Sequence, residues 1–202
     1  MGSIIDMIGA LIFGGLLLLT AARLERFVVS TQQQSNFDSR TQQNCIQLGE
    51  ILENDLYGAG AGVSQGTNVF LSASPDSLRF KYDPDGNGVP DSVSYYAGPK
   101  NSAANPNQRS LVRIYDGVSQ KMNLGLTNLK FFYYDSFGTA TIVLKNIIAV
   151  RVKLDVESDF RSVTAGGTST PGDVLGSKPG AADTVYNGVH WEQYIVPKRL
   201  HY

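Results

Sequence analysis

Cysteine, histidine and charge are all scarce in this chain of 202 residues. Cys45 is the single cysteine, so no disulfide can form within the chain. Only 17% of the residues are charged, and the formal net charge is −1. Nucleic-acid-binding proteins normally present a basic face, so this balance argues against that class. The two histidines, His190 and His201, stand near the C-terminus without a metal-ligand spacing.

Catalytic motifs are absent as well. The sequence has no G-x-S-x-G, no phosphate-binding loop, and no cysteine–histidine pair with a supporting context. Cys45 is expected to be a half-buried small residue rather than a nucleophile. The tyrosine pairs Tyr95-Tyr96 and Tyr133-Tyr134 predict aromatic side chains of a sheet, with a sugar-binding platform as the alternative. We therefore expect a protein that is not an enzyme.

A long apolar run is present near the N-terminus. From Met7 to Ala22 there are 16 residues without a charge. Ile4 and Ile5 extend the run to about the 20 residues that cross a bilayer as a helix. No lysine or arginine precedes the run and no small-x-small cleavage site ends it, so we expect a retained anchor rather than a signal peptide.

The orientation of this anchor stays open. Arg23 and Arg26 follow the run directly, and the positive-inside rule would place them, and the rest of the chain, in the cytoplasm. The rest of the chain is rich in Tyr, Thr, Ser, Asn and Gly, as exported β domains often are. A basic leader removed from a longer precursor would resolve the conflict.

The helical pattern continues beyond the apolar run. Residues 30–43 are nearly all polar, but apolar residues recur at helical spacing from Ile46 to Leu56. Successive glycines from Gly58 to Gly62 are expected to end the helix. A continuous helix over residues 4–57 would be about 80 Å long.

Beyond the glycines the apolar period changes to two, which indicates strands with one buried face. The clearest case is residues 148–157, where Val150, Val152 and Leu154 share one face. Further strands are expected at residues 69–71, 78–82, 92–96, 111–115, 129–134 and 191–196. Loops are expected at residues 97–109 and 162–188.

The apolar faces predict an α+β fold, in which a long N-terminal helix, apolar in its first half and amphipathic in its second, packs on an antiparallel β-sheet head. We expect residues 1–29 to be a transmembrane or filament-core helix, residues 30–57 its amphipathic continuation, and residues 58–202 the head. The expected helix–sheet core consists of Ile46, Leu48, Ile51, Leu52, Leu56, Val150, Val152 and Leu154.

One segment has the ligand spacing of a calcium loop. It supplies side-chain oxygens at loop positions 1, 3, 5 and 9, a carbonyl at position 7, and Gly88 for the sharp turn at position 6. The candidate ligands are Asp83, Asp85, Asn87, Asp91 and the carbonyl of Val89. Ser94 stands at position 12, where a glutamate is usual. Calcium is the one candidate cofactor, expected to bind weakly and to stiffen the turn; the alternative is a hydrated hairpin turn.

In its order of elements, the chain resembles the type IV pilin and type II secretion pseudopilin superfamily. The string ILENDLYGAGAGV is similar to the end of the long helix in larger minor pilins and J-type pseudopilins. The string LRFKYDPDGNGVPDSVSYY resembles their acidic hairpin, and NLKFFYYD, NIIAVRVKLDVESD and WEQYIVPKRL follow in the order of their late strands. The start departs from the family, because it has no basic leader and no GFTLIE-like string.

The resemblance implies assembly through the N-terminal helix. Members carry an acid at mature position five, thought to neutralise the terminal amine of a neighbouring subunit; loss of Met1 would place Asp6 there. A carboxylate in an apolar environment is costly unless paired; the alternative places Asp6 in water at the membrane edge. Glycines of the run would allow close helix approach, or are simply tolerated in a bilayer. The residues assigned to assembly are Gly2, Asp6, Gly9, Leu11, Phe13, Gly14, Gly15 and Leu17.

The family likeness thus implies a structural subunit of an extracellular type IV pilus-like filament or a periplasmic pseudopilus of a prokaryote. Such a subunit is anchored in the inner membrane before assembly, and its partners are further copies or related pilin-like subunits. The alternative is a membrane-tethered β-domain, a stalked receptor or adhesin, that binds a surface or secreted-protein ligand and does not polymerise.

Overall fold

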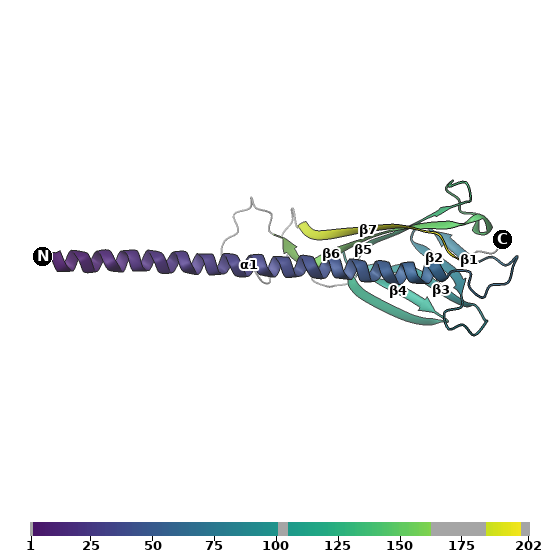
Figure 1. Ribbon diagram of the computed structural model, residues 1–202, viewed down its shortest axis with the longest axis horizontal. Helices are drawn as coiled ribbons and strands as arrows, with labels where there is room; N and C mark the ends of the chain where they lie inside the picture. Colours follow the sequence, from purple (N-terminus) through teal and green to yellow (C-terminus); the bar gives the residue numbers. More distant parts are fainter. Residues whose placement is uncertain (1, 101–104, 163–184, 199–202) are drawn as a thin grey trace. The chain divides into compact units, whose positions relative to one another are not determined.

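The computed structural model describes residues 2–100, 105–162 and 185–198. It contains the helix α1 (Gly2–Gly58), a short 3₁₀ helix η1 (Leu144–Asn146) and a seven-stranded sheet (Figure 1). The strands are β1 (Phe70–Ser74), β2 (Ser77–Tyr82), β3 (Asp91–Lys100), β4 (Arg109–Tyr115), β5 (Val118–Tyr134), β6 (Ala149–Ser162) and β7 (Val185–Ile195). Each strand pairs antiparallel with the next one along the chain. The predicted α+β fold is confirmed.

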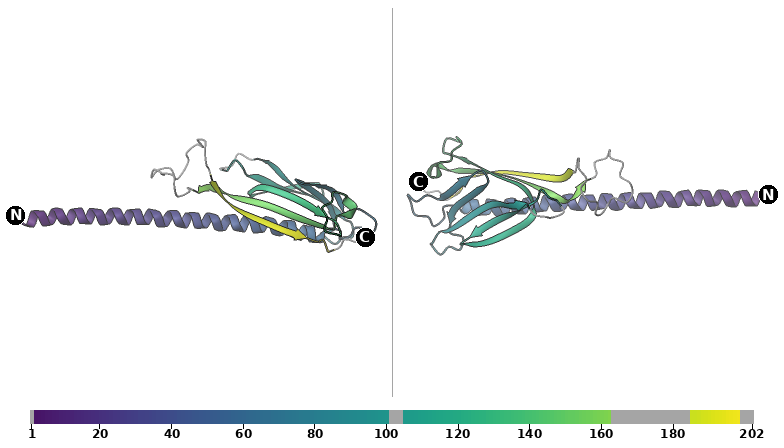
Figure 2. Two further views of the ribbon diagram at one scale, coloured as in Figure 1. Left: turned by 90° about the horizontal axis from the view of Figure 1, so that it is seen from above. Right: turned by 180° about the vertical axis from the view of Figure 1, so that it is seen from behind.

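The chain divides into two compact units, Met1–Ser39 and Arg40–Tyr202. In its described residues, the first unit consists of helix alone. The second unit holds the last turns of α1 together with the sheet, and in both views of Figure 2 those turns lie along one face of the curved strands. We refer to this second unit as the head.

One side of α1 supplies the core of the head. Leu48, Leu52 and Leu56 have no exposed surface, because the spacing of four residues keeps them on one helix face. They belong to the same buried cluster as Val150 and Val152 of β6, which are also fully buried. Each leucine buried in this way contributes roughly 2 kcal/mol of hydrophobic stabilisation.

Of the other predicted core residues, two belong to the core and one does not. Leu154 is fully buried, and Ile51 is partly buried and packs against the cluster. The assignment of Ile46 to the core was wrong, because its side chain is 53% exposed. Cys45 occupies the core-facing position instead, and one residue further along a helix turns the side chain by about 100°.

Glycines in and directly after α1 allow close contacts with the sheet. At Gly49, a Cβ atom would lie 2.6 Å from the indole of Trp191 on β7. The helix ends at Gly58, and the backbone of Gly60 then donates to the carbonyl of Lys81 at 2.9 Å. Gly60 has a φ of 87°, which side-chain-bearing residues rarely adopt. The predicted helix stop is therefore also a backbone connection to β2.

Two predicted loops begin or end inside strands. Strand β3 continues to Lys100, which pairs with Arg109 across an irregularity that follows Ala97. Pairing with β4 therefore outweighs the glycine and proline of this stretch, which alone favour a loop. Of the predicted loop 162–188, Ser162 and residues 185–188 are strand, and residues 163–184 lie outside the described residues.

Candidate functional site: the apolar segment of the helix

The first unit carries an apolar surface that nothing in the described chain covers. Its exposed large apolar residues are Ile4, Met7, Ile8, Leu11, Ile12, Phe13, Leu16, Leu17, Leu18, Leu19, Leu24, Phe27, Val28 and Val29. We call residues 4–29 the apolar segment. Phe13, Leu17 and Leu18 are 70 to 73% exposed. Single exposed apolar residues are normal, but a contiguous surface of this kind marks contact with membrane or protein.

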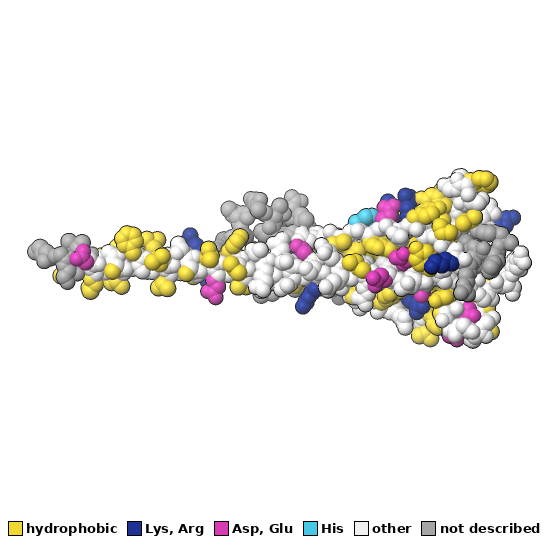
Figure 3. Space-filling view, in the orientation of Figure 1, with side chains coloured by type: hydrophobic (Ala, Val, Ile, Leu, Met, Phe, Trp, Pro, Cys, Tyr) yellow, Lys and Arg dark blue, Asp and Glu magenta, His cyan; other side chains and the backbone are white. Residues whose placement is uncertain are grey.

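The apolar surface surrounds the helix rather than forming a stripe. Leu16, Leu17, Leu18 and Leu19 are consecutive and all exposed, and four consecutive residues point to all sides of a helix. Figure 3 shows apolar side chains on both edges of this part of α1. A helix that is apolar all round is normally buried in a membrane or among other helices. Within the described residues, α1 alone is long and apolar enough to span a bilayer.

The predicted assembly residues all lie on this stretch of α1. Gly2 begins the helix, and the side chains of Asp6, Leu11, Phe13 and Leu17 are exposed. At Gly9, Gly14 and Gly15, an added Cβ would meet nothing within 4 Å. The glycines therefore leave open surface at which another helix could approach closely.

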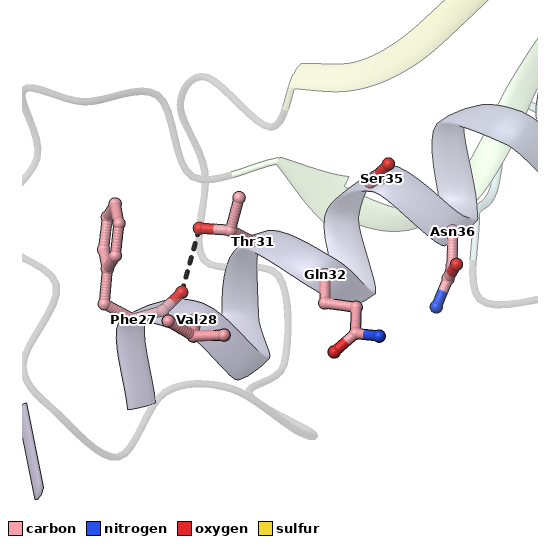
Figure 4. Close-up of a pocket in the computed structure, with 6 residues that line it drawn as sticks. All are labelled: Phe27, Val28, Thr31, Gln32, Ser35 and Asn36. Carbon is pink, nitrogen blue, oxygen red and sulfur yellow. Dashed lines mark hydrogen bonds between the residues drawn. The ribbon is translucent and has the colours of Figure 1, made fainter. Parts of the chain in front are cut away.

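The apolar segment gives way to polar side chains within a few turns. Phe27, Val28, Thr31, Gln32, Ser35 and Asn36 line a hollow beside α1 (Figure 4). Their spacing of three and four residues places them on one side of the helix. The hydroxyl of Thr31 donates to the carbonyl of Phe27 at 2.9 Å. Only amides and hydroxyls follow the last apolar side chains on this side, so the apolar segment ends without a charged boundary there.

In the predicted calcium loop, the first carboxylate holds the turn. Asp83 accepts hydrogen bonds from the backbone amides of Gly86 and Gly88, at 2.8 and 2.9 Å on its two oxygens. Desolvation acts to raise the pKa of Asp83, but hydrogen bonds from the amides of Gly86, Asn87 and Gly88 and from Asp85 together hold the pKa below its ordinary value. Asp83 is therefore a carboxylate that the loop keeps ionised.

The other candidate side-chain ligands, Asp85, Asn87 and Asp91, also have partners within the head. Asp85 accepts from the backbone and side-chain amides of Asn87, and Asn87 accepts from the backbone of Val89 at 2.7 Å. Asp91 accepts a 2.7 Å hydrogen bond from Tyr115, which raises the pKa of this tyrosine to about 12. Among the described residues, no three His, Cys, Asp or Glu side chains gather as metal ligands do. These bonds are those of a stabilised turn, and calcium binding stays a prediction.

A buried charged cluster was not predicted from the sequence. Asp55 of α1 accepts hydrogen bonds from Tyr95 of β3 at 2.5 Å and from Arg113 of β4 at 2.7 Å. Burial, followed by the charge of Asp55, raises the pKa of Tyr95. Desolvation acts to lower the pKa of Arg113, but the hydrogen bonds and charges of Asp55 and Tyr95 together outweigh it, and the pKa is raised. The signal available in the sequence was Asp55 itself, an acid within the apolar face that ends at Leu56.

The other residues considered for chemistry are mainly structural. Cys45 is 1% exposed, and burial, followed by the charge of Asp155, raises its pKa to about 11. Its thiol is therefore protonated at neutral pH and is a poor nucleophile. Tyr95 and Tyr133 are buried, whereas Tyr96 is 37% exposed. His201 lies outside the described residues, and His190 lies on β7.

Comparison with known proteins gives matches among solved structures alone. No protein-family model and no curated protein match this sequence. Among solved structures, the chain is similar to a type IV-like pilin from Thermus thermophilus, with a TM-score of 0.48 and 13% sequence identity. The alignment covers 80% of this chain and 98% of that protein.

Proposed function

We propose that this protein is a structural subunit of a type IV pilus-like filament or pseudopilus, which assembles through the apolar segment. The observation that carries the proposal is the set of 14 large apolar side chains exposed on residues 4–29. At roughly 1.5–3 kcal/mol for each such side chain, their burial is worth about 20–40 kcal/mol before ordering costs. A gain of this size supports an apolar environment on every side of the helix.

Two environments suit the same surface at different stages. Before assembly, the apolar segment would lie in the inner membrane, where lipid surrounds it. After assembly, the segments of neighbouring subunits would surround one another, with the head on the outside. Open surface at Gly9, Gly14 and Gly15 supports close packing of such helices.

Asp6 would have a specific part in this assembly. Its carboxylate is exposed on the apolar segment, and a charge there becomes costly once the surrounding surface is buried. Pairing with the N-terminal amine of a neighbouring copy would neutralise it. This ion pair would then fix the relative position of neighbouring subunits, while the apolar contacts would supply most of the free energy of assembly.

Electron microscopy of material sheared from cells tests the proposal. Filaments that an antibody against the head decorates are expected for the wild type. Asp6→Ala should abolish them while the head keeps its thermal unfolding temperature, and the matched removal of an exposed acid on β6, Asp159→Ala, should leave them intact. Recovery of the wild-type chain only as a detergent-extracted monomer would overturn the proposal and favour a stalked binding module.

A further inference from the structure

The outer face of β5, β6 and β7 forms a second surface with an unusual composition. We use this name for the side of the three strands that faces away from the buried cluster. Alternate residues of β6 point there, and Arg151, Lys153 and Asp155 have side chains 33 to 39% exposed. Cross-strand pairing aligns His190 of β7 with Asp155. In Figure 3, the upper edge of the head shows histidine (cyan), acidic (magenta), basic (dark blue) and hydrophobic (yellow) side chains beside one another.

At one end of the outer face is a hollow of about 590 Å³. Its lining residues are Lys100, Asn107, Arg109, Thr127, Asn128, Asp155, Glu157, Gly188, Val189 and His190. Only Val189 among them has an apolar side chain. Sites for drug-like molecules are mostly apolar with a few polar groups, so this hollow suits a ligand that is hydrophilic over most of its surface.

The acceptors of the hollow are held in fixed positions. Asp155 accepts a hydrogen bond from Asn128 at 2.9 Å and faces the Nδ1 atom of His190 at 2.6 Å. Glu157 accepts from the buried amide of Asn105 at 2.8 Å. Each carboxylate can accept further hydrogen bonds, so both are oriented to receive hydroxyl groups of a ligand.

Two cations at the same hollow are available for an anion. Within the described parts of the chain, neither Lys100 nor Arg109 forms an ion pair. Arg109 donates one hydrogen bond to the carbonyl of Gly98 at 3.3 Å, which leaves other donors of its guanidinium group for a carboxylate. Asp155 and Glu157 line the same hollow as these cations, so the hollow combines donors for a carboxylate with acceptors for hydroxyl groups.

Aromatic rings extend the surface along the strands. Phe132, Arg151 and Tyr194 are aligned across β5, β6 and β7. The two rings are 38% and 49% exposed, and the guanidinium carbon of Arg151 lies 4.7 Å from the Phe132 ring centroid. This row is four residues along β6 from Asp155, or about 13 Å. Exposed rings stack on the C–H faces of sugar rings, and this separation suits a short oligosaccharide.

We propose that the outer face of β5–β7, together with the ends of β3 and β4 that line the hollow, binds an acidic oligosaccharide, one that carries a uronic acid. The sugar carboxylate binds Lys100 and Arg109, hydroxyls bind Asn128, Asp155 and His190, and a neighbouring sugar stacks on Phe132 or Tyr194. The proposal does not depend on polymerisation, because all these residues belong to the head.

Calorimetric titration of the full chain in detergent micelles, with trigalacturonate as the probe, tests the proposal. Saturable binding is expected, with weaker or no binding of a neutral glucose trisaccharide and of triglutamate. The double variant K100A/R109A should weaken binding of trigalacturonate at least about tenfold, and F132A should weaken it several-fold.

Lys121→Ala provides the matched control, because Lys121 is an exposed lysine elsewhere on β5. Circular dichroism should show unchanged folding for every variant. Absence of trigalacturonate binding, equal binding of the neutral sugar, or equal binding of triglutamate would overturn the proposal; the last result would indicate a general anion surface.

Discussion

Asp55 shows how a single charged residue can define the way a helix packs on a sheet. It lies on the apolar side of α1, yet its carboxylate meets Tyr95 and Arg113 from two neighbouring strands. The side chains of Arg113 and Asp55 are only 18% and 13% exposed. A buried pair of this kind contributes less to net stability than to a single, well-defined arrangement, because desolvation offsets much of the attraction.

Removal of one partner should therefore be costly. We expect Asp55→Asn to lower the free energy of unfolding of the head by about 3 kcal/mol, because it leaves the Arg113 guanidinium buried without its counter-charge. Urea unfolding, followed by circular dichroism of the head signal, measures this loss. The matched control is Asp76→Asn, which breaks the exposed ion pair with Lys130 and should change stability by less than about 1 kcal/mol. Equal losses in both variants would contradict a buried role for Asp55.

Individual core positions were predictable to the extent that periodicity alone decides them. Leu48, Leu52 and Leu56 repeat every four residues and are buried as predicted. Ile46 is equally apolar but lies on the other side of the helix, and the choice between it and Cys45 depends on where the sheet is. Side-chain polarity could not supply that information, since a cysteine in a polar stretch gives little sign of burial.

At the scale of elements, α1 carries two kinds of glycine. Gly49 is buried against Trp191, whereas Gly15 faces open space. In an exposed helix interior, alanine is favoured over glycine by up to about 1 kcal/mol. The contact with Trp191 should reverse this preference at Gly49.

This difference gives a paired prediction. Gly49→Ala should lower the unfolding temperature of the head, because its Cβ would lie 2.6 Å from the indole. Gly15→Ala should leave that temperature unchanged or slightly raised. Differential scanning calorimetry of both variants in the same detergent decides the question, and a stabilised Gly49→Ala head would show that Trp191 does not pack there.

The loop from Asp83 to Asp91 is the element for which calcium binding is proposed. If calcium binds, it should raise the unfolding temperature of the head, and EGTA should reverse this. Asp83→Ala should remove the response to calcium. If the unfolding temperature is the same with calcium and with EGTA, the loop does not bind calcium and is only a hydrogen-bonded turn.

The same loop has a pH dependence that does not require calcium. The folded pKa of Asp83 lies below its ordinary value, so its hydrogen bonds add stability above the unfolded pKa. That stability is lost as the pH falls through the folded pKa, in the range below about 4. Asp83→Ala should therefore destabilise the head at neutral pH and have less effect in acid, as measured by urea unfolding at each pH.

Strands were predicted well where one face is continuously apolar and poorly elsewhere. Strand β5 was expected from Leu129, but it begins at Val118 and its first half is mostly polar. The available signal was the Asp116-Gly117 pair, since both residues have positive φ, at 46° and 77°, in the turn that joins β4 to β5. Asp-Gly between two strands is a strong indication of a hairpin. The calcium-like spacing of the loop between β2 and β3 was visible in the sequence, but the hydrogen bonds within that loop could not be predicted from the spacing.

For the molecule as a whole, we propose that the apolar segment is an assembly surface and that the head is a display surface. The sequence predicts both parts because length and hydrophobicity identify them independently of any tertiary contact. Contacts between subunits depend on pairs of residues in different copies, which a single chain does not contain. Cys45 offers a way to test them, because its buried thiol leaves the native chain without a reactive cysteine.

The most direct test is thiol accessibility in sheared filament material. Leu17→Cys, in the apolar segment, should be protected from a water-soluble maleimide, whereas Val118→Cys, 63% exposed on the head before substitution, should be labelled rapidly. No lipid is needed for that protection if neighbouring subunits cover Leu17. Labelling of Leu17→Cys as fast as Val118→Cys, or absence of the chain from the sheared fraction, would contradict the account.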